Sequence, residues 1–300
     1  MAAKVTIVVL SHNRPALLEK ALRSIVEQTY PDCEVLVVDN ASSSSARIRD
    51  VVLGFHGVRL LANTTNRGFT GGMNQGLAEA SGEYVYLTED DIEIERECVA
   101  TLVDYLARHP NVALAGPVMW NRGSLTIRCA GGSFSLGSVY RMDVTGAGAI
   151  NLPDTAPFQT MYIPGAMIAA RTAIFRSLGG FRSDFFMYSE DVELCARVVE
   201  RGWTMAIVPA ARVFHHEPPE DPEAPALSFH KQKNLAALYM LHAPMKVLPA
   251  FFARYLIGDG GRRLLRNRAT LPTWGAAWVF ALARSPKFFA ERLRRACATP

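Results

Sequence analysis

Continuous apolar runs alternate with segments of helical periodicity in the first part of the chain. Residues 5–10, 34–38 and 83–88 are apolar runs of strand length, whereas Leu18, Leu22, Ile25 and Val26 recur at helical spacing. A helix and a strand are expected over 46–61, and a glycine-rich turn at 66–72 leads into a short helix ending at Ala80. Continuous apolar strands that alternate with helices indicate an α/β fold with a mostly parallel sheet flanked by helices.

The later part of the chain changes character twice. Residues 120–160 are rich in Gly, Ser and Thr and predict an irregular or β-rich insertion, after which strand and helix patterns return over 162–214. A proline cluster at 218–225 then precedes helical segments that Pro244, Pro249 and Pro272 interrupt. We therefore expect an α/β domain at 1–225 and a helical region at 226–300.

Composition indicates a globular chain. Of its 300 residues, 49% are hydrophobic and 20% are charged, and its five cysteines form no Cys-x-x-Cys pair. Reduced thiols in the cytoplasm are expected rather than disulfides or a zinc site. The apolar run at 5–10 is too short for a secretory signal, and no uninterrupted run of 18 apolar residues indicates a transmembrane helix.

Positive charge is concentrated near the C-terminus. Residues 226–300 hold 13 of the 32 Lys and Arg but only 2 of the 28 Asp and Glu, although the net charge of the whole chain is +4. This region predicts contact with an anionic membrane surface, through Lys246, Arg254, Arg262, Arg263, Arg266 and Arg268 and the aromatic Phe251, Phe252, Tyr255, Trp274 and Trp278. The alternative is that these helices bury their apolar faces on the first domain. No recognition motif for nucleic acid accompanies the charge, so no nucleic-acid partner is expected.

The glycines exclude two classes of nucleotide-binding protein. No glycine precedes Gly54, whereas a dinucleotide-binding fingerprint or a P-loop needs glycines in the first strand-to-helix turn, where backbone approaches phosphate. A nicotinamide-dependent enzyme and a P-loop kinase are therefore not expected.

An acidic run, Glu89-Asp90-Asp91, directly follows the apolar strand at 83–88. Ligands of parallel sheets bind at the carboxyl ends of strands. Carboxylates placed there can hold one hard cation, which in turn can hold a diphosphate. The alternative interpretation is a solvated acidic turn.

Five motifs occur in an order that is typical of one family. They are VTIVVLSHNR, VLVVDNAS, NRGFTGGMNQGLAEASGEYVYLTEDD, FFMYSEDVELCARVVERGW and VFHH. Over about residues 4–217 the chain resembles family 2 glycosyltransferases of the GT-A fold, notably bacterial rhamnosyl- and galactofuranosyl-transferase-like members. The resemblance implies a Rossmann-like nucleotide-diphospho-sugar transferase domain, here followed by a C-terminal helical extension.

The resemblance also implies a donor site. It places Ser11 and Arg14 in the nucleotide pocket and gives Asp39 a hydrogen bond from the base. The donor site is completed by Asn66, Arg67, Gly68, Asn74 and Asp90. From the residues alone, Asp39 is equally a strand-end cap, and Asn66 and Asn74 are turn-forming or helix-capping residues.

A divalent cation, Mg²⁺ or Mn²⁺, is implied at the acidic run. Asp91 matches the last acid of the family's Asp-x-Asp motif, and Glu89 stands where that motif usually has its first Asp. A histidine after a later strand completes the metal site in the family, which favours His215, with His216 as the second candidate. The alternative interpretation is that these two adjacent histidines are ordinary surface residues that bind no metal.

A second acidic pair, Glu190-Asp191, opens a segment with a helical apolar face. Acids at a helix N-terminus are favoured by its dipole, so capping is one interpretation. A positioned carboxylate can also take the proton of an attacking hydroxyl. The resemblance implies that Asp191 is this catalytic base and that Glu190 holds the acceptor or supports the base. The preceding aromatics Phe185, Phe186 and Tyr188 are candidates for stacking on a sugar.

These patterns predict an inverting, metal-dependent glycosyltransferase, since single displacement by a hydroxyl inverts the anomeric centre. Its partners would be a nucleotide-sugar donor and a glycan or lipid-linked saccharide acceptor, in the synthesis of cell-envelope polysaccharide. It is expected in the cytoplasm, peripherally bound at the inner face of the cell membrane. A non-catalytic nucleotide-sugar or glycan-binding protein is the main alternative, and a two-carboxylate hydrolase is another. The presence of both acidic clusters argues against the first.

Overall fold

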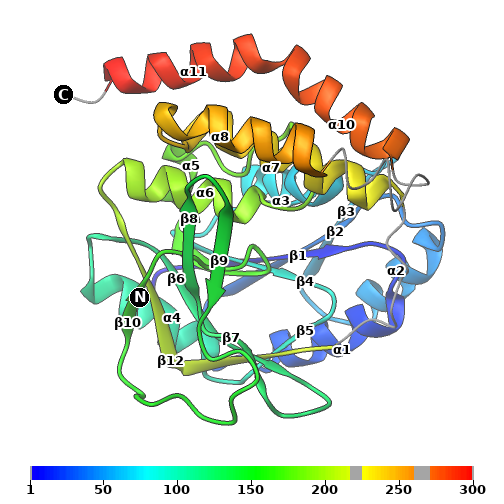
Figure 1. Cartoon of the computed structure of the whole chain (residues 1–300). Coiled ribbons are helices and arrows are strands. Elements are labelled where there is room, and N and C mark those ends of the chain that lie inside the picture. Colours follow the sequence, from blue (N-terminus) through cyan, green and yellow to red (C-terminus); the bar gives the residue numbers. More distant parts are fainter. Residues whose placement is uncertain (1, 217–224, 260–270, 299–300) are drawn as a thin grey trace.

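A ten-stranded sheet forms the centre of the computed structural model, which describes residues 2–216, 225–259 and 271–298 (Figure 1). The strand order is β10-β12-β6-β11-β4-β1-β2-β3, with β5 paired to β12 and β7 paired to β6. Strands β1, β2, β3 and β4 are mutually parallel, as are β6 and β12. The predicted α/β fold with a mostly parallel sheet is confirmed.

The N-terminal part consists of regularly alternating strands and helices. The elements in chain order are β1 (Val5–Ser11), α1 (Pro15–Val26), β2 (Cys33–Asp39), α2 (Ser45–Leu53), β3 (Val58–Ala62), α3 (Gly68–Glu79) and β4 (Tyr84–Glu89). All seven residues of β1 are buried, because parallel strands covered by helices on both faces have no solvent side. Helix α1 begins at Pro15, where the missing N–H costs nothing, and buries Leu18, Leu22 and Ile25. Val26 is exposed, so its predicted place in the apolar stripe is wrong.

The second part completes the sheet with antiparallel strands. It contains β5 (Ile92–Ile94), α4 (Cys98–Arg108), β6 (Val112–Asn121), β7 (Ile127–Cys129), β8 (Gly132–Leu136), β9 (Tyr140–Val144), β10 (Phe158–Thr160), β11 (Met167–Arg171), α5 (Thr172–Ser177), α6 (Glu190–Glu200) and β12 (Thr204–His215). The predicted β-rich insertion at 120–160 is therefore correct. Strand β11 lies between β4 and β6 and is antiparallel to both. The long strand β12 pairs with β6 in parallel, with a register shift between Ile207 and Arg212.

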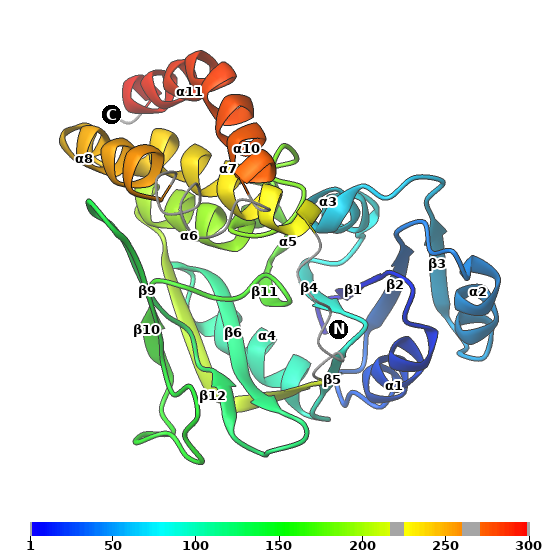
Figure 2. The same ribbon diagram turned by 45° about the vertical axis from the view of Figure 1, so that its right-hand side comes forward.

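The C-terminal helices pack together on the side of the molecule where α6 lies (Figures 1 and 2). They are α7 (Pro225–His242), η1 (Met245–Val247), α8 (Leu248–Phe252), η2 (Ala253–Asp259), α10 (Leu271–Ala283) and α11 (Ser285–Ala298). Their apolar faces form a second core that also takes in Phe185. Phe251 and Trp278 are buried in this core, so the prediction that these two enter a membrane interface is wrong. Arg262, Arg263, Arg266 and Arg268 lie outside the described residues.

No helix within the described ranges is both long enough and apolar enough to span a bilayer. The described cysteines, Cys33, Cys98, Cys129 and Cys195, are free thiols.

Candidate active site

The carboxyl ends of β1, β2 and β4 meet at one edge of the sheet. Ser11 is in register with Asp39 across β1 and β2, and Leu10 is in register with Glu89 across β1 and β4. The parallel pairing thus brings the predicted donor-site residues of three separate motifs to the same place, as expected for an α/β sheet.

The acidic run surrounds the guanidinium of Arg14. One nitrogen of Arg14 lies 2.5 Å from Oδ2 of Asp91, and the other lies 2.8 Å from Oδ1 of Asp90 and 3.9 Å from Oε2 of Glu89. Burial and the charge of Asp91 raise the pKa of Glu89. Three neighbouring carboxylates therefore gather around one cationic group, which is the electrostatic environment that a metal cation also requires.

Asp90 is anchored to the end of β1. Its Oδ2 accepts hydrogen bonds from Ser11 Oγ at 2.8 Å and from the backbone N–H of His12 at 3.2 Å. Asp90 is fully buried, and burial raises its pKa to about 7 against the opposing effect of Arg14. The bond between Ser11 and Asp90 thus connects the end of β1 to the acidic run that follows β4.

Asp91 and His215 offer the ligands for a cation. His215 Nε2 lies 3.8 Å from Asp91 Oδ2, and two ligands at ~2.1 Å from one ion lie no more than ~4.2 Å apart. His216 instead pairs with Glu93 on β5, although its backbone N–H donates to the Asp91 carbonyl at 2.8 Å. The geometry therefore favours His215 over His216 as a ligand.

Within the described ranges, no three His, Cys, Asp or Glu side chains are close enough to hold a metal by themselves. This pattern fits a metal shared with substrate, because Mg²⁺ is commonly held by one or two carboxylates plus phosphate oxygens. If Asp91 supplies an oxygen ligand and His215 a nitrogen ligand, the other coordination positions of the cation stay open to diphosphate oxygens.

Asp39 has the contacts of a strand-end cap. It is fully buried, its Oδ1 accepts from the Ser42 N–H at 3.0 Å, and its Oδ2 accepts from Ser45 Oγ at 2.7 Å. These bonds hold the loop between β2 and α2. A contact between Asp39 and a nucleobase stays a prediction.

Asn40 organises the turn before α3. Its Oδ1 accepts from the backbone N–H of Arg67 at 2.9 Å, and its Nδ2 donates to the Gly68 carbonyl at 3.0 Å and to Asn66 Oδ1 at 2.9 Å. Asn66 Oδ1 also accepts from the Gly68 N–H at 2.8 Å. Asn66 therefore forms the turn, as its residue type suggests, while the side chain of Arg67 is exposed.

Gly68 has no room for a side chain. Its φ is +70°, and an added Cβ would lie 2.4 Å from the carbonyl oxygen of Phe186. The Thr70 N–H donates to the same oxygen at 3.1 Å. The turn at 66–70 is therefore in direct contact with the loop that precedes α6.

Asn74 fastens α3 to the loop before the second acidic pair. Its Nδ2 donates to the Phe181 carbonyl at 2.7 Å, and its Oδ1 accepts from the Phe181 N–H at 2.8 Å. Phe181 in turn packs edge-on against Phe69, with ring centroids 5.2 Å apart. Asn74 thus holds α3 against the segment that leads to Glu190 and Asp191.

Glu190 and Asp191 begin α6, as predicted. Asp191 Oδ2 accepts a hydrogen bond from Tyr162 Oη at 2.7 Å, and its Oδ1 accepts from the Val192 N–H at 2.8 Å. Burial raises the pKa of Asp191, and the bond from Tyr162 opposes this shift. Asp191 is therefore an oriented carboxylate with enhanced basicity, the property that a general base needs.

Glu190 is a buried acid with unsatisfied hydrogen-bonding capacity. Its side chain is 7% exposed, and Oε2 has no hydrogen-bond partner among the described residues. Burial and the neighbouring Asp191 raise its pKa well above the ordinary value. An unpartnered buried carboxylate is costly to stability and therefore characteristic of a functional site.

The aromatic residues before α6 have protein partners. Phe185 is buried in the second core. The ring of Phe186 stacks on His230, with centroids 4.6 Å apart, and Lys231 lies 4.9 Å from the ring centre of Tyr188. Stacking of a sugar on Phe185 is excluded by its burial.

The two acidic clusters lie within electrostatic reach of each other. Burial is the largest cause that raises the pKa of Glu89 and of Glu190, and the charge of Asp191 adds to the first shift and that of Glu89 to the second. A site at the carboxyl edge of an α/β sheet, with three acids on one side and an oriented carboxylate on the other, is an arrangement typical of a group-transferring enzyme.

Comparisons with known proteins place the chain more narrowly. The model of glycosyl transferase family 2 matches residues 6–164, so the chain belongs to this family of glycosyltransferases. A relative from Mycobacterium tuberculosis, N-acetylglucosaminyl-diphospho-decaprenol L-rhamnosyltransferase, is 25% identical over 249 residues, which cover 75% of this chain and 81% of the relative. The resemblance stated from the motifs is confirmed.

Solved structures agree on the fold. The structure of GalNAc-T7 with UDP, GalNAc and Mn²⁺ matches with a TM-score of 0.67 and 16% identity over 84% of this chain, which spans only 50% of that protein. The mannosyltransferase PcManGT from Pyrobaculum calidifontis, in complex with GDP-Man and Mn²⁺, matches with a TM-score of 0.57 and 22% identity, covering 100% of this chain and 82% of that one. These matches show the GT-A fold, whereas the assignment to glycosyltransferases comes from the family match over residues 6–164.

Several residues of the site escaped the sequence analysis. Asn40 follows Asp39 directly at a strand end, a position that could have indicated it. Tyr162 lies just beyond the insertion, where no periodicity marks it.

Proposed function

We propose that this protein is an inverting, cation-dependent glycosyltransferase that moves a sugar from a nucleotide-diphospho-sugar to a hydroxyl group of a lipid-linked saccharide or glycan. The observation that carries the proposal is a backbone contact: in the turn that Asn40 holds beside the sheet edge, the Thr70 N–H donates at 3.1 Å to the Phe186 carbonyl of the loop that leads into Asp191. A proton acceptor and a diphosphate-binding region within one site are what a single displacement requires.

The acceptor hydroxyl loses its proton as it attacks the anomeric carbon. Asp191 takes this proton, and the 2.7 Å bond from Tyr162 holds its carboxylate in one orientation. Attack from the face opposite the leaving diphosphate inverts the anomeric configuration. Glu190 lies next to the base with a free oxygen and binds an acceptor hydroxyl.

A divalent cation, Mg²⁺ or Mn²⁺, held by Asp91 and His215 and adjoined by Glu89 would neutralise negative charge on the leaving diphosphate. Arg14 supplies a permanent positive charge beside the same carboxylates. The donor nucleotide lies along the carboxyl ends of β1 and β2, near Ser11 and Asp39, with the turn at Asn66 and Gly68 closing the pocket. The two structural neighbours, solved with Mn²⁺ together with UDP and GalNAc or with GDP-Man, support this arrangement.

The lipid-linked acceptor is proposed from the relative of M. tuberculosis, which is named for a decaprenol-linked saccharide. A protein that uses such an acceptor works at a membrane surface, which we propose to be the inner face of the cell membrane. The C-terminal region 226–300 fits this role, because it is basic and leaves Val279 and Leu282 of α10 exposed. We keep the division into a catalytic domain at 1–225 and a membrane-associating region at 226–300 as part of the proposal.

The test is Asp191→Asn. Titration of UDP-, GDP- and dTDP-sugars in the presence of Mn²⁺ by calorimetry identifies the donor, and transfer is then measured with that donor. Asn keeps the shape but cannot accept the proton, so kcat should fall at least about a hundredfold while donor affinity and melting temperature stay close to wild type. Near-normal turnover would remove Asp191 as the base. A capping role for Asp191 gives this contrary outcome, because Asn caps helices as well as Asp.

A further inference from the structure

The loop that leads into Glu190 has an unusual backbone. Phe186, Tyr188 and Ser189 have φ angles of 66°, 69° and 61°. Side chains other than glycine rarely adopt this left-handed region, because Cβ crowds the following carbonyl group. Three such residues among the four that precede the catalytic pair need an external support.

That support comes from one asparagine of α7. Asn234 Nδ2 lies 2.9 Å from the carbonyl oxygen of Phe185, 2.8 Å from that of Met187 and 2.7 Å from that of Tyr188. The side chain is 1% exposed, so water does not compete for these bonds. One amide group thus gathers three carbonyl groups of the loop around a single point.

The preceding lysine completes the contact. Lys233 Nζ donates to the carbonyl oxygens of Asp184 at 2.7 Å and Phe185 at 3.1 Å, and to Asn234 Oδ1 at 2.6 Å. All three hydrogens of the ammonium group are therefore used within the protein. Lys233 is 5% exposed, and burial lowers its pKa to about 8. A buried cation that binds only neutral oxygens is costly, so packing alone does not explain its presence.

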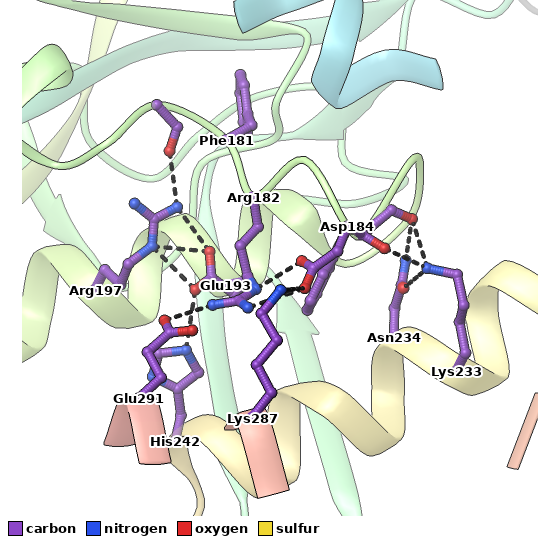
Figure 3. Close-up of polar contacts among 12 residues, drawn as sticks. Phe181, Arg182, Asp184, Glu193, Arg197, Lys233, Asn234, His242, Lys287 and Glu291 are labelled. Atoms are coloured by element: carbon purple, nitrogen blue, oxygen red, sulfur yellow. Dashed lines mark hydrogen bonds and ion pairs between the residues drawn. The ribbon is translucent and has the colours of Figure 1, made fainter. Parts of the chain in front are cut away.

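Side-chain ion pairs also join α6 and the segment before it to the C-terminal helices. Glu193 pairs with Arg197 at 2.7 Å and with His242 of α7 at 3.3 Å, while Arg182 bridges Asp184 at 2.8 Å and Glu291 of α11 at 2.6 Å (Figure 3). These ion pairs join side chains and dock the helices. The contacts of Lys233 and Asn234 instead engage backbone carbonyl groups of the loop itself.

We propose that Lys233 and Asn234 are positioning residues, which hold loop 184–189 in its left-handed conformation and thereby aim Glu190 and Asp191 at the reacting groups. This inference rests on the proposed function, since it takes Asp191 as the base. It gives the C-terminal region a part in catalysis that is distinct from membrane contact.

The test uses Asn234→Asp in the full chain. The substitution keeps size and shape but replaces the donating NH₂ group by an oxygen, which repels the three carbonyl groups. We expect kcat to fall about tenfold to a hundredfold, because small displacements of a catalytic group cost that much. Calorimetric donor affinity with Mn²⁺ should stay within about twofold, well below one power of ten in the binding constant.

A second pair of variants keeps the test decisive if Asn234→Asp does not fold. Lys233→Met removes the charge and the donors, whereas Lys233→Arg retains them, so Arg should recover most of the kcat that Met loses. Arg292→Ala is the matched control: it removes the 2.6 Å bond from α11 to the Ala243 carbonyl and disturbs helix docking without touching the loop. The control should lower the melting temperature but leave kcat per folded molecule unchanged.

The inference is overturned if folded Asn234→Asp, or folded Lys233→Met, keeps a kcat close to wild type. It is also overturned if the Arg292→Ala control loses as much kcat as the loop variants, because the role would then be docking alone. Failure of the proposed function is recognised separately. In that case Asp191→Asn itself retains turnover.

Discussion

Arg14 Nη1 lies 2.5 Å from Oδ2 of Asp91, so the carboxylate that we assign to the cation already has a positively charged partner. A divalent cation must compete with the guanidinium for this oxygen. We expect Arg14→Gln, without donor, to bind Mn²⁺ on the order of tenfold more tightly, since one charge-assisted contact of about 1.4 kcal/mol corresponds to that factor. Calorimetric titration with Mn²⁺ measures the change.

The control for Arg14 is Arg59→Gln. Arg59 also pairs with two acids, Glu34 at 3.0 Å and Glu79 at 3.4 Å, but these lie away from the sheet edge that binds the donor. Its removal makes the same change in net charge and should leave Mn²⁺ affinity as in the wild type. Equal affinity in wild type and Arg14→Gln would show that Asp91 does not bind the cation.

The two adjacent histidines should behave differently. His215→Ala removes the nitrogen 3.8 Å from Asp91 Oδ2 and should abolish the Mn²⁺-dependent part of nucleoside-diphosphate binding. His216→Ala breaks only the pair with Glu93 and should retain it. Calorimetry with UDP, GDP and dTDP, with and without Mn²⁺, compares the variants. The reverse order of effects would assign the ligand to His216.

Tyr162 should set the acidic limb of the pH profile. Its hydroxyl group donates to Asp191 and lowers the pKa of that carboxyl, which burial raises. A base acts only when deprotonated, so activity rises as pH passes upward through its pKa. Tyr162→Phe removes the bond, raises the pKa of Asp191 and should move the acidic limb of kcat to higher pH, with little loss at alkaline pH.

Tyr140→Phe serves as the comparison for Tyr162. Tyr140 lies near enough for the charge of Asp191 to raise its pKa, but its hydroxyl bonds Met142 at 3.5 Å instead. Its profile should match the wild type. A Tyr162→Phe profile that also coincides with the wild type contradicts the role of Asp191 as the titrating base.

Alanine substitutions at Gly68 and Gly57 should distinguish the cost of a steric contact from the cost of a left-handed backbone. Both have positive φ, +70° and +78°, but an added Cβ meets Phe186 at Gly68 and nothing within 4 Å at Gly57. Gly57→Ala should cost only the left-handed conformation, about 1–2 kcal/mol. Gly68→Ala should destabilise the protein further and lower both donor affinity and kcat. Urea unfolding and kinetics measure these effects, and equal losses of stability would argue against the tight contact.

Exposed apolar residues of α10 should contribute to membrane binding. The double variant Val279→Asp/Leu282→Asp should float less with anionic liposomes, because two apolar side chains no longer enter the interface. Leu53→Asp, on the distant helix α2, makes a similar exposed change and should float normally. Each Lys or Arg near an anionic surface contributes roughly 1 kcal/mol. Unchanged flotation of the double variant would contradict the role of the apolar side chains. Equal flotation of the wild type with neutral and anionic vesicles would contradict the role of the basic residues.

The parallel half of the fold was predictable because its order is local. Strands β1, β2 and β4 are mostly apolar runs, and each ends in a polar residue at the sheet edge. Parallel register then brings Ser11, Asp39 and Glu89 together without further information. The position of β11 between β4 and β6 was not predictable, since no local pattern specifies which strands an antiparallel strand joins.

Long-range contacts explain the residues that were missed. Tyr162 meets Asp191 across 29 residues, and Asn234 meets Phe185 across 49. Left-handed φ angles at Phe186 and Tyr188 oppose the preferences of those residue types, so only tertiary contacts can specify them. The burial of Phe251 and Trp278 was missed because an amphipathic helix has the same sequence pattern whether its apolar face contacts protein or lipid.

The contact of Asn234 with loop 184–189 also imposes an order on biosynthesis. The ribosome completes the strained loop before it adds the asparagine that supports it, 49 residues after Phe185. Until then the nascent chain holds its acids on an unsupported loop. We infer that catalytic competence arrives only when α7 docks, which delays sugar transfer beyond the synthesis of the catalytic residues themselves.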